Sequence, residues 1–413
     1  MYKRQTYTRL NQVSSDRNAE GTLTLYVYDE MGRLTSTVKA AGTATSRSVL
    51  SRYDVQGRLI GELSGEGAAK LDGSQTQAEI DAIWKTYGTT YTYDAVGRRT
   101  SMTDGAGQRT LYYFDVNGRV THTINALGYV QEQVYDNRGQ VVETIRYGAP
   151  VALQGLNGGL ANDALRLAIA ATSNADVDIH ATYAYTQDGR VAKETDGAGG
   201  VIEHSYDAFG NEIQRLTKIA GAISRTDRMA YDRMGRLTQT TADALQYARK
   251  AQREYDAFGR VITDRDGNGQ SVKHEYDRLG REVLTSDGIG DKKTAYDAFG
   301  NVLWRIDELG RRTSYSYDTA ARSATVTTPD GVSVTTIHNA FGQTVEVRDG
   351  NGNVSRYTYN ADGSRVRAEA GGTVVTEAHD RLNRLTETVD GRGVKTVYTY
   401  DAPVSYTHLA AHR

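Results

Sequence analysis

Residues 255–281 read YDAFGRVITDRDGNGQSVKHEYDRLGR, and this stretch holds one complete copy of a unit that recurs along the whole 413-residue chain. The unit begins with Tyr-Asp-x-x-Gly, usually followed by Arg. Clear copies start at Tyr28, Tyr53, Tyr93, Tyr135, Tyr206, Tyr231, Tyr255, Tyr276 and Tyr296, and looser copies at Tyr7, Phe114, Tyr185, Tyr317, His338, Tyr359, His379 and Tyr400. From Tyr255 onward the starts are 20 or 21 residues apart. Self-similarity at a short fixed period indicates a repeat architecture, in which each unit packs mainly on its neighbours.

Each unit has the sequence of a β-hairpin. After Gly259-Arg260 comes the β-branched run Val261–Thr263, then the turn sequence Asp266–Gly269, then an alternating segment that ends at Tyr276. Asp at the first and Gly at the fourth position of Asp-x-x-Gly favour a type I turn. Two strands of about six residues and two short turns account for the period. We therefore predict about sixteen consecutive hairpins in a strongly curved antiparallel strip, and we set aside a parallel β-solenoid because turn signals flank every strand.

Two features of the repeat predict side-chain packing. Many motif tyrosines follow another tyrosine by two residues, as in Tyr91/Tyr93 and Tyr357/Tyr359, which places both rings on one face of a strand and predicts aromatic ladders across the sheet. The third residue of Asp-x-x-Gly is also often apolar. It is apolar at Met31, Val96, Phe209, Met234, Phe258, Leu279 and Phe299. A solvated turn does not need these residues, so we expect the turn tips to pack against another part of the wall.

The rhythm is interrupted twice. The gap from Tyr53 to Tyr93 is 40 residues and contains Ser74–Trp84, which has helical apolar spacing behind a Ser cap. The gap from Tyr135 to Tyr185 is 50 residues and contains the Ala- and Leu-rich segment 160–171. We expect a single wall of repeats over residues 6–403, with helical insertions at about 71–88 and 150–180 that pack on the sheet, and a non-native tail at 404–413. Tyr7 already lies one period before Tyr28, so the chain is expected to be a fragment of a longer array.

Composition excludes several functional classes. Net charge is −2, so the basic footprint of a nucleic-acid-binding protein is absent. There is no Cys and therefore no disulfide or thiolate chemistry, and the sequence has no 18-residue apolar run that predicts a membrane span. Only 38% of residues are hydrophobic, which is too few for one large two-sided core. The 28 Tyr against 5 Phe indicate sheet surfaces that are apolar but partly wet.

The repeat resembles the RHS or YD-repeat family. The resemblance rests on Tyr-Asp-x-x-Gly-Arg followed, eleven residues after the Tyr, by Asp-Gly-x-Gly, and this full pattern is present at Tyr93/Asp104, Tyr255/Asp266 and Tyr276/Asp287. It extends from about Tyr7 to Asp401. In that family, β strips spiral into a hollow shell. Bacterial members, including polymorphic toxins and insecticidal toxin complexes, enclose a C-terminal toxin, and animal teneurins use related repeats in adhesion. The family's self-cleaving Asp-Pro-x-Gly junction is not present here, since Ala402-Pro403 follows Asp401.

Candidate chemical motifs have simpler structural explanations. Asp264-x-Asp266-x-Asn268-Gly269-x5-Glu275 satisfies the EF-hand calcium pattern, but its flanks have strand sequences where an EF-hand has helices. His338 and His379 occupy the motif's Tyr position, and His204 and His274 precede a motif Tyr by two residues, so we interpret them as replacements for aromatic residues. The Asp residues are turn formers. We therefore assign no catalytic, cofactor-binding or metal-binding residue and no cofactor, and we do not expect an enzyme.

The first functional hypothesis is a structural segment of an RHS-type shell that encloses a toxin or effector fused downstream. The resemblance implies as partners this C-terminal toxin and a secretion or delivery machinery, and a secreted or cell-surface location. The alternative is a carbohydrate-binding or adhesion module whose tyrosine ladders stack on cell-surface glycans. The two differ in whether the ladders face into the shell or outward, which the sequence leaves open.

Overall fold

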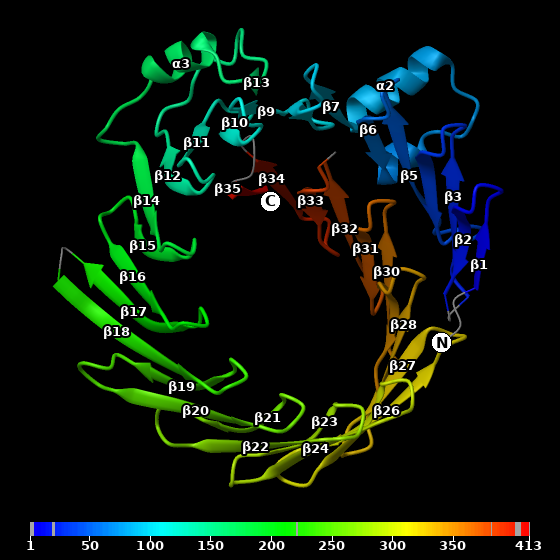
Figure 1. The fold of residues 1–413 in the computed structure, drawn as a ribbon. Coiled ribbons are helices and arrows are strands. Elements are labelled where there is room, and N and C mark those ends of the chain that lie inside the picture. Colours follow the sequence, from blue (N-terminus) through cyan, green and yellow to red (C-terminus); the bar gives the residue numbers. More distant parts are fainter. Residues whose placement is uncertain (1–3, 19–20, 220–221, 381, 401–405, 413) are drawn as a thin grey trace.

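The computed structural model describes residues 4–18, 21–219, 222–380, 382–400 and 406–412, and for 406–412 it describes the backbone alone. Within these residues the chain forms one sheet of 35 strands and three helices. Residues 401–403, on which the absence of a self-cleaving junction was based, lie outside the described part. The all-β class predicted from the repeat is confirmed (Figure 1).

The strands follow the sequence repeat. Those before the second insertion are β1 (Arg4–Tyr7), β2 (Val13–Arg17), β3 (Leu23–Tyr28), β4 (Leu34–Lys39), β5 (Arg47–Tyr53), β6 (Leu59–Ser64), β7 (Thr89–Tyr93), β8 (Arg99–Thr103), β9 (Arg109–Phe114), β10 (Val120–Ile124), β11 (Val130–Tyr135) and β12 (Val141–Arg146). The next group is β13 (Gly159–Leu160), β14 (Ile179–Tyr185), β15 (Val191–Thr195), β16 (Val201–Tyr206), β17 (Glu212–Ile219), β18 (Ala222–Tyr231), β19 (Leu237–Ala242), β20 (Arg249–Tyr255), β21 (Val261–Arg265), β22 (Ser271–Tyr276), β23 (Glu282–Ser286), β24 (Asp291–Tyr296) and β25 (Val302–Ile306). The last group is β26 (Arg312–Asp318), β27 (Ser323–Thr327), β28 (Ser333–His338), β29 (Thr344–Arg348), β30 (Val354–Tyr359), β31 (Arg365–Ala370), β32 (Thr373–His379), β33 (Leu385–Val389), β34 (Lys395–Tyr400) and β35 (Tyr406–His412).

Neighbouring strands pair antiparallel in chain order, as β20 with β21 and β21 with β22. The exception is the two-residue β13, which pairs parallel with β9, while β12 pairs directly with β14. The parallel solenoid is thereby excluded. In each hairpin, one end carries the Tyr-Asp-x-x-Gly turn, which we call the YD turn, and the sheet edge formed by these turns is the YD edge. The turns that lead from one hairpin to the next form the return edge.

A β-bulge at the motif Tyr bends most hairpins in the same way. In β22–β23, Tyr276 pairs with Glu282 while Glu275 pairs with Leu284, so Val283 is an extra residue on one strand. The same shift lies at Tyr53, Tyr93, Tyr135, Tyr206, Tyr231, Tyr255, Tyr296 and Tyr359. A bulge bends its strand and increases the local twist. Because the bend recurs in most repeats at the same end of the hairpin, the strip curves into a ring (Figure 1).

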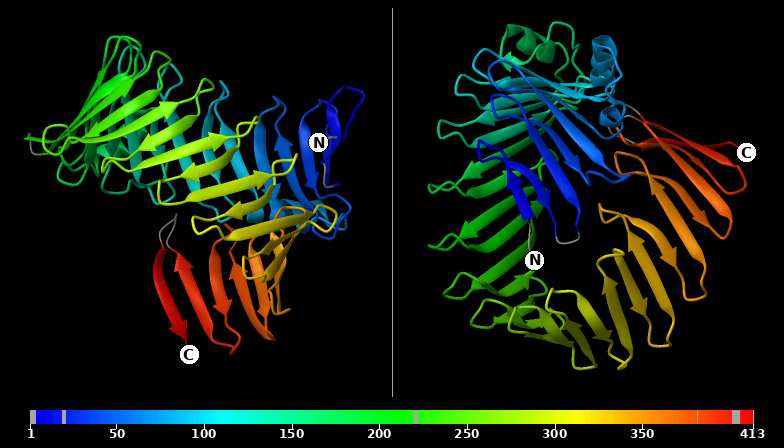
Figure 2. Two further views of the ribbon diagram at one scale, coloured as in Figure 1. Left: turned by 90° about the horizontal axis from the view of Figure 1, so that it is seen from below. Right: turned by 90° about the vertical axis from the view of Figure 1, so that its right-hand side faces the viewer.

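The strip makes slightly more than one circuit of that ring. The orange and red strands near the C-terminus return beside the blue N-terminal strands and lie displaced from them along the ring axis (Figure 2). Hydrogen bonds join the two circuits between residues that are 295 to 300 positions apart. The repeat that starts at Tyr53 thus meets the repeat that starts at Tyr359, twelve repeat starts later, so one circuit takes about twelve repeats and the two insertions make up the rest of the separation.

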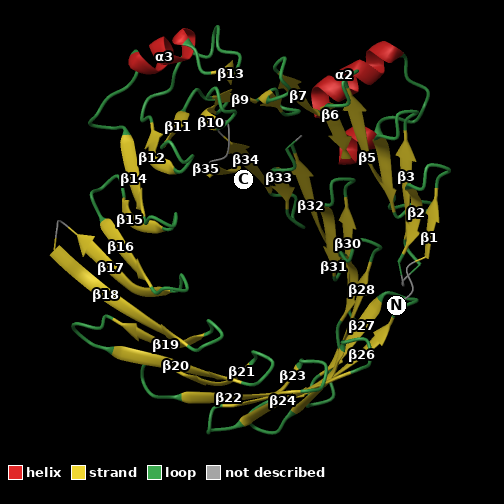
Figure 3. Cartoon of the chain, viewed as in Figure 1, coloured by secondary structure: helices red, strands yellow, loops and turns green. Residues whose placement is uncertain are grey.

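The helices occupy the two insertions (Figure 3). α1 (Gly65–Ala69) and α2 (Gln77–Tyr87) lie in the first, and α3 (Asp163–Ala170) in the second. α3 covers the sheet over β9–β11, where it forms the main buried cluster. That cluster consists of Leu111, Tyr113, Ile124, Val130, Val151, Leu156, Leu165 and Ile169. Apart from this cluster and the stretch that α1 and α2 cover, the described wall is a single layer.

The first helical prediction is partly wrong. α2 begins three residues after Ser74, because Thr76 and Glu79 form a capping box, in which the amide of Thr76 donates to Glu79 Oε2 at 2.7 Å. The hydroxyl of Ser74 instead donates to Asp72. α1 was not predicted, because its sequence Gly-Glu-Gly-Ala-Ala contains two glycines, which are poor helix formers. Trp84 packs on the sheet as expected. It is 6% exposed and covers Gly61, where a Cβ would lie 3.1 Å from the indole.

Candidate functional site: the YD turns and the seam

The carboxylate of each motif Asp organises its YD turn. In the turn at Asp256, the amide of Gly259 donates to Asp256 O at 3.1 Å, and Gly259 has φ 85°. Asp256 Oδ1 accepts from the amides of Phe258 and Arg260 at 2.9 and 3.0 Å, and Oδ2 accepts from Arg260 Nε at 2.6 Å. The predicted turn, with Gly in the left-handed region, is confirmed.

The motif Arg connects each repeat to the next. Arg260 Nη1 donates to Asp277 O at 3.3 Å, and its guanidinium carbon lies 4.7 Å from the centroid of the Tyr276 ring. The same two contacts join Arg33 to Tyr53, Arg58 to Tyr93, Arg119 to Tyr135, Arg236 to Tyr255 and Arg281 to Tyr296. A cation–π contact contributes about 0.5–1 kcal/mol at exposed sites. One such contact stabilises the fold only slightly, but the same contact is present at each of these repeats.

The motif Tyr connects each repeat to the one before. Tyr276 Oη donates to Val261 O at 2.7 Å, and Val261 is the first strand residue of the preceding repeat. The same bond joins Tyr135 to Val120, Tyr206 to Val191, Tyr255 to Leu237, Tyr359 to Thr344 and Tyr400 to Leu385. Tyr, Asp and Arg of one motif thus contact both neighbours, and these contacts form a continuous row along the YD edge.

The predicted aromatic ladders have a different form in the structure. Among the described residues, His204 and Tyr206 stack, with ring centroids 6.4 Å apart and an angle of 18° between the ring planes. Tyr255, Tyr276 and Tyr296 do not stack on one another, because an Arg guanidinium from the preceding repeat lies over each of these rings. At these repeats arginine and tyrosine alternate along the sheet.

The motif tyrosines face the inside of the ring. Trp84 of α2 packs against Gly61 and lies 4.1 Å from the guanidinium of Arg52, whose side chain is on the face opposite that of Tyr53. α3 packs on Leu111 and Tyr113, which alternate with the motif residue Phe114. Figure 1 shows α2 and α3 on the outer side of the ring. The face they cover is therefore the outer one, and we call the opposite, inward face the tyrosine face.

The tyrosine face is polar between its rings. His204 Nδ1 lies 2.6 Å from Glu212 Oε1, and its Nε2 lies 3.6 Å from Glu194 Oε1. Arg215 pairs with Glu212 at 2.7 Å. His274 and Glu282 repeat the His–Glu pair at 3.2 Å. Two of the histidines that were interpreted as replacements for aromatic residues, His204 and His274, therefore lie beside carboxylates on the inner wall.

Acid is expected to weaken the YD turns. The amide and then the guanidinium of Arg281 hold the pKa of Asp277 below its ordinary value of 3.8, and hydrogen bonds from the motif Arg lower the pKa of Asp29 and Asp232 in the same way. A carboxyl with a lowered folded-state pKa stabilises the fold at neutral pH, and this stability is lost as pH falls through the folded pKa. We expect the melting temperature to fall steeply below about pH 4, as followed by circular dichroism.

A matched variant for the acid experiment is Asp277→Asn. Asn339 occupies the same slot in its own repeat, and its Oδ1 accepts two turn amides at 2.9 and 3.1 Å. Asp277→Asn should therefore keep the turn, lose the pair with Arg281, and show a smaller drop in melting temperature in acid. A melting temperature that stays flat to pH 2.5 would contradict the role given to these carboxylates.

The prediction that the apolar turn tips pack against the wall is wrong for the seven residues on which it was based. Their side chains are exposed, with values from 71% for Met234 to 89% for Phe209. At two equivalent positions, Phe341 and Leu382, the tips are partly buried. These two lie where the second circuit meets the first, so the tips are covered only where another circuit is present.

We call this meeting of the two circuits the seam. At its centre, Glu66 of α1 contacts the YD turn that contains Ala361 and Asp362. The amide of Ala361 donates to Glu66 Oε1 at 3.0 Å, and the amide of Glu66 donates to the carboxylate of Asp362. Gly65 has φ 51°, and a Cβ there would lie 1.4 Å from Asp362 Oδ1, so Gly is required at this position. Both carboxylates are used in joining the circuits.

Arg47 forms the second part of the seam. Its guanidinium carbon lies 3.9 Å from the centroid of the Phe341 ring, and its Nη2 donates to Gln343 Oε1 at 2.7 Å. Gln343 Nε2 donates in turn to Gly363 O at 2.6 Å. Because Arg47 begins β5 on the return edge, the YD edge of the second circuit lies against the return edge of the first.

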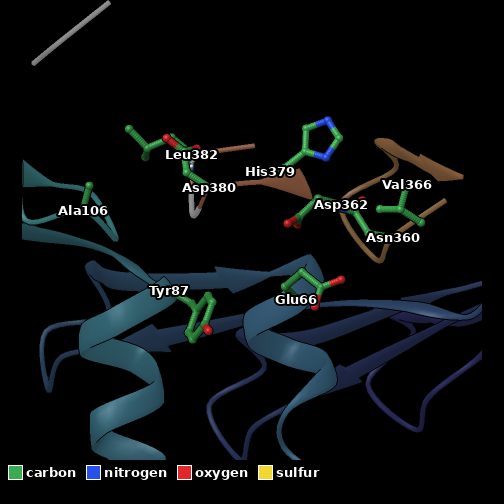
Figure 4. A pocket seen from close by; sticks show the side chains of 9 residues that line it. All are labelled: Glu66, Tyr87, Ala106, Asn360, Asp362, Val366, His379, Asp380 and Leu382. Atoms are coloured by element: carbon green, nitrogen blue, oxygen red, sulfur yellow. Dashed lines mark hydrogen bonds between the residues drawn. The ribbon is translucent and has the colours of Figure 1, made fainter. Parts of the chain in front are cut away.

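A cavity of about 680 Å³ lies beside these contacts (Figure 4). Glu66 and Tyr87 line one side, and Asp362, His379 and Asp380 line the other. Asp380 is paired with Arg384 at 2.7 Å, and the other two carboxylates bind backbone amides. Although the cavity contains acidic groups and a His, these carboxylates are already engaged in structural contacts.

The seam was not predicted, but the sequence contains a signal for it. The two repeats at its centre depart from the motif, with Asn339 and Asn360 in the Asp slot and Gln343 and Ser364 in the Arg slot. Without the internal Asp–Arg pair, Gln343 is free to bind Arg47 and Gly363 across the seam. Clustered departures from a repeat motif thus mark a contact between circuits.

The calcium motif is not assembled into a loop. Asp266 is the turn residue, and its Oδ1 accepts from the amides of Asn268 and Gln270. Asp264 pairs with Val272 in the ladder and lies 3.4 Å from Arg253. Val272 and Glu275 alternate on β22, so Asp264 and Glu275 are on opposite faces of the sheet. Among the described residues, no cluster of three or more acidic or His side chains has the geometry of a metal site.

Addition of calcium or EDTA should leave the melting temperature unchanged. A ligand that binds only the folded state at 100 times its dissociation constant would stabilise it by about 2.7 kcal/mol, which is readily measured. A calcium-dependent shift that disappears in both Asp266→Ala and Glu275→Ala would make this segment an ion site after all.

Comparisons with known proteins agree with the repeat. The RHS Repeat family model matches residues 7–45, 255–289 and 296–333, which confirms the resemblance in sequence for these segments. A search of curated proteins gives no match. Within the described residues, no helix has both the length and the apolarity required to cross a membrane.

Several solved structures are similar to this chain. A TcdB2-TccC3-Cdc42 crystal structure matches with 12% identity and a TM-score of 0.36, over 97% of this chain and 28% of the other. The Photorhabdus luminescens Tc holotoxin pore with a mutated TccC3 matches with 12% identity and a TM-score of 0.28, over 97% of this chain and 27% of the other. A porin-like protein from Bacteroides uniformis matches with 12% identity and a TM-score of 0.17, over 63% and 86%. The chain thus spans little more than a quarter of the Tc proteins it matches.

Proposed function

We propose that the chain is a wall segment of an RHS-type shell that encloses a toxin or effector carried by the same full-length protein. The observation that carries this proposal is the continuity of the wall. Each complete motif contacts the repeats on both sides, and the seam joins one circuit to the next. A strip with both properties can extend by adding repeats and still remain closed between its circuits.

The inner surface suits such a role. On the tyrosine face, the ring of Tyr276 is covered by Arg260, and Glu212 is paired with both His204 and Arg215. A surface whose polar groups are already paired has little left to bind one folded partner strongly, so it can surround a polypeptide without holding it in one conformation. The proposed role needs no catalytic residue, and we assign the chain none.

The adhesion alternative is less well supported. Glycan recognition by the motif tyrosines would need exposed rings and free hydroxyls. The ring of Tyr276 is instead covered by Arg260, its hydroxyl donates to Val261 O, and the face it belongs to is the inner one. As implied by the shell role, we propose a secreted or cell-surface location and delivery by a secretion system.

The proposal is tested by protease protection in the full-length protein. The segment downstream of the wall should be cleaved far more slowly than the same segment expressed alone. Arg47→Ala combined with Glu66→Ala removes the seam contacts and should speed that cleavage. Arg166→Ala, which removes an exposed ion pair on α3, is the matched control and should leave the rate unchanged. Equal cleavage of the enclosed and isolated segments would overturn the proposal.

A further inference from the structure

Five consecutive YD turns carry an exposed apolar residue at the same position. These residues, which we call the apolar row, are Phe209, Met234, Phe258, Leu279 and Phe299, and they are 89%, 71%, 84%, 72% and 80% exposed. Neighbouring YD turns are two strands apart, which places successive side chains about 10 Å from one another along the YD edge. A contiguous exposed apolar surface of this kind is typical of an interaction site.

The seam shows how such a residue is covered. Phe341 occupies the same turn position, and there the guanidinium of Arg47 packs on its ring at 3.9 Å. Leu382, also at this position, lines the cavity between the circuits. In both cases the covering surface is the return edge of another circuit. The YD edge that bears the apolar row is continuous with the YD edge that forms the seam.

The return edge of this chain offers the complementary groups elsewhere. Arg47 is the first residue of β5, and Arg249 and Arg312 are likewise the first residues of β20 and β26. Both are exposed. The chain therefore carries the two halves of the same type of contact on opposite edges. Among the described residues of one chain, these halves meet at the short overlap that forms the seam.

We propose that the apolar row binds the return edge of a second copy of this chain, with arginines at strand starts packed on the phenylalanines as Arg47 packs on Phe341. Contacts between two different edges are heterologous, so copies join head to tail and the assembly does not close as a symmetric dimer. This contact goes beyond the proposed function, since it is independent of whether the wall encloses a cargo.

Sedimentation velocity of the 413-residue chain over a range of concentrations tests the proposal. We expect a series of species that grows with concentration. Phe209→Ser, Phe258→Ser and Phe299→Ser together should give a monomer at every concentration. The control carries Val27→Ser, Leu167→Ser and Val177→Ser, at exposed apolar positions outside the YD edge, and should associate like the parent chain. Unchanged circular dichroism melting of both variants shows that the fold is kept.

A mixing experiment tests the direction of the contact. A second variant, Arg249→Glu with Arg312→Glu, alters the return edge and leaves the apolar row intact, and alone it should associate much less than the parent. In a mixture of the two variants, the intact apolar row of the arginine variant can bind the intact return edge of the phenylalanine variant. Neither chain can bind a further copy, so assembly should stop at a two-chain species. The proposal fails if the parent chain is monomeric throughout, if it forms only a closed dimer, if the phenylalanine variant associates like the parent, or if the mixture behaves as the sum of its components.

Discussion

Leu111→Ala is expected to lower the free energy of unfolding by about 2–5 kcal/mol, the range for a large-to-small change in a packed core. Leu111 is 1% exposed and packs in the cluster that α3 closes over β9–β11. Most of the wall is one layer thick, so this cluster is one of the few places where a cavity would be enclosed on all sides. Denaturation by urea, followed by circular dichroism, measures the change.

The control for this substitution is Leu167→Ala. Leu167 lies on the same helix that covers Leu111 but is 63% exposed, and a surface change of this kind usually stays within about 0.5 kcal/mol. Equal losses for the two variants would mean that α3 does not close a core against the sheet.

Gly280→Val, and equally Gly259→Val, is expected to cost more than about 1 kcal/mol, since a β-branched residue is strained at positive φ. Their φ values are 82° and 85°, and a Cβ at either would come no closer than 3.7 Å to its neighbours. The cost is therefore one of backbone conformation and not of lost space.

Ala257→Val is the control that distinguishes the effect of Val at a positive-φ glycine from the effect of Val elsewhere in the same turn. Ala257 is an exposed residue of the same turn as Gly259, and it is not among the residues with positive φ. Val is tolerated there, so the denaturation midpoint should barely move. If all three variants unfold at the parent's midpoint, the turn assignment on which the repeat interpretation depends is wrong.

The local parts of the structure could be predicted from sequence because they repeat. The hairpin, the type I turn and the position of Gly259 follow from Asp-x-x-Gly and a fixed period, since each depends on residues within one unit. The insertions were found because they break the period. Within them the boundary of α2 was misjudged, since both Ser74 and Thr76 are good caps and the choice depends on Glu79 reaching back to Thr76.

The seam could not be predicted, because it joins residues about 300 positions apart and depends on how much each repeat bends. That bend comes from the bulge at the motif Tyr, and its size is a property of the whole sheet. The turn tips were misjudged for the same reason. Phe341 is covered and Phe209 is exposed, although the two share one motif position, because only one of them meets another circuit.

The account depends most on the closure of the wall at the seam, and a crosslink across it is the most direct test. The chain has no Cys, so Ala69→Cys with Ala361→Cys introduces the only two thiols, at two residues that line one cavity at the seam, and keeps Glu66 in place. A short bis-maleimide should join them in the native protein, and the crosslinked chain should migrate faster in denaturing gels. The control pair, Ala69→Cys with Ala320→Cys, uses a YD turn two repeats earlier and should not react across the seam. Efficient crosslinking of the first pair alone is the predicted result. No crosslink in that pair, or equal crosslinking in both, would contradict a wall whose circuits are joined edge to edge.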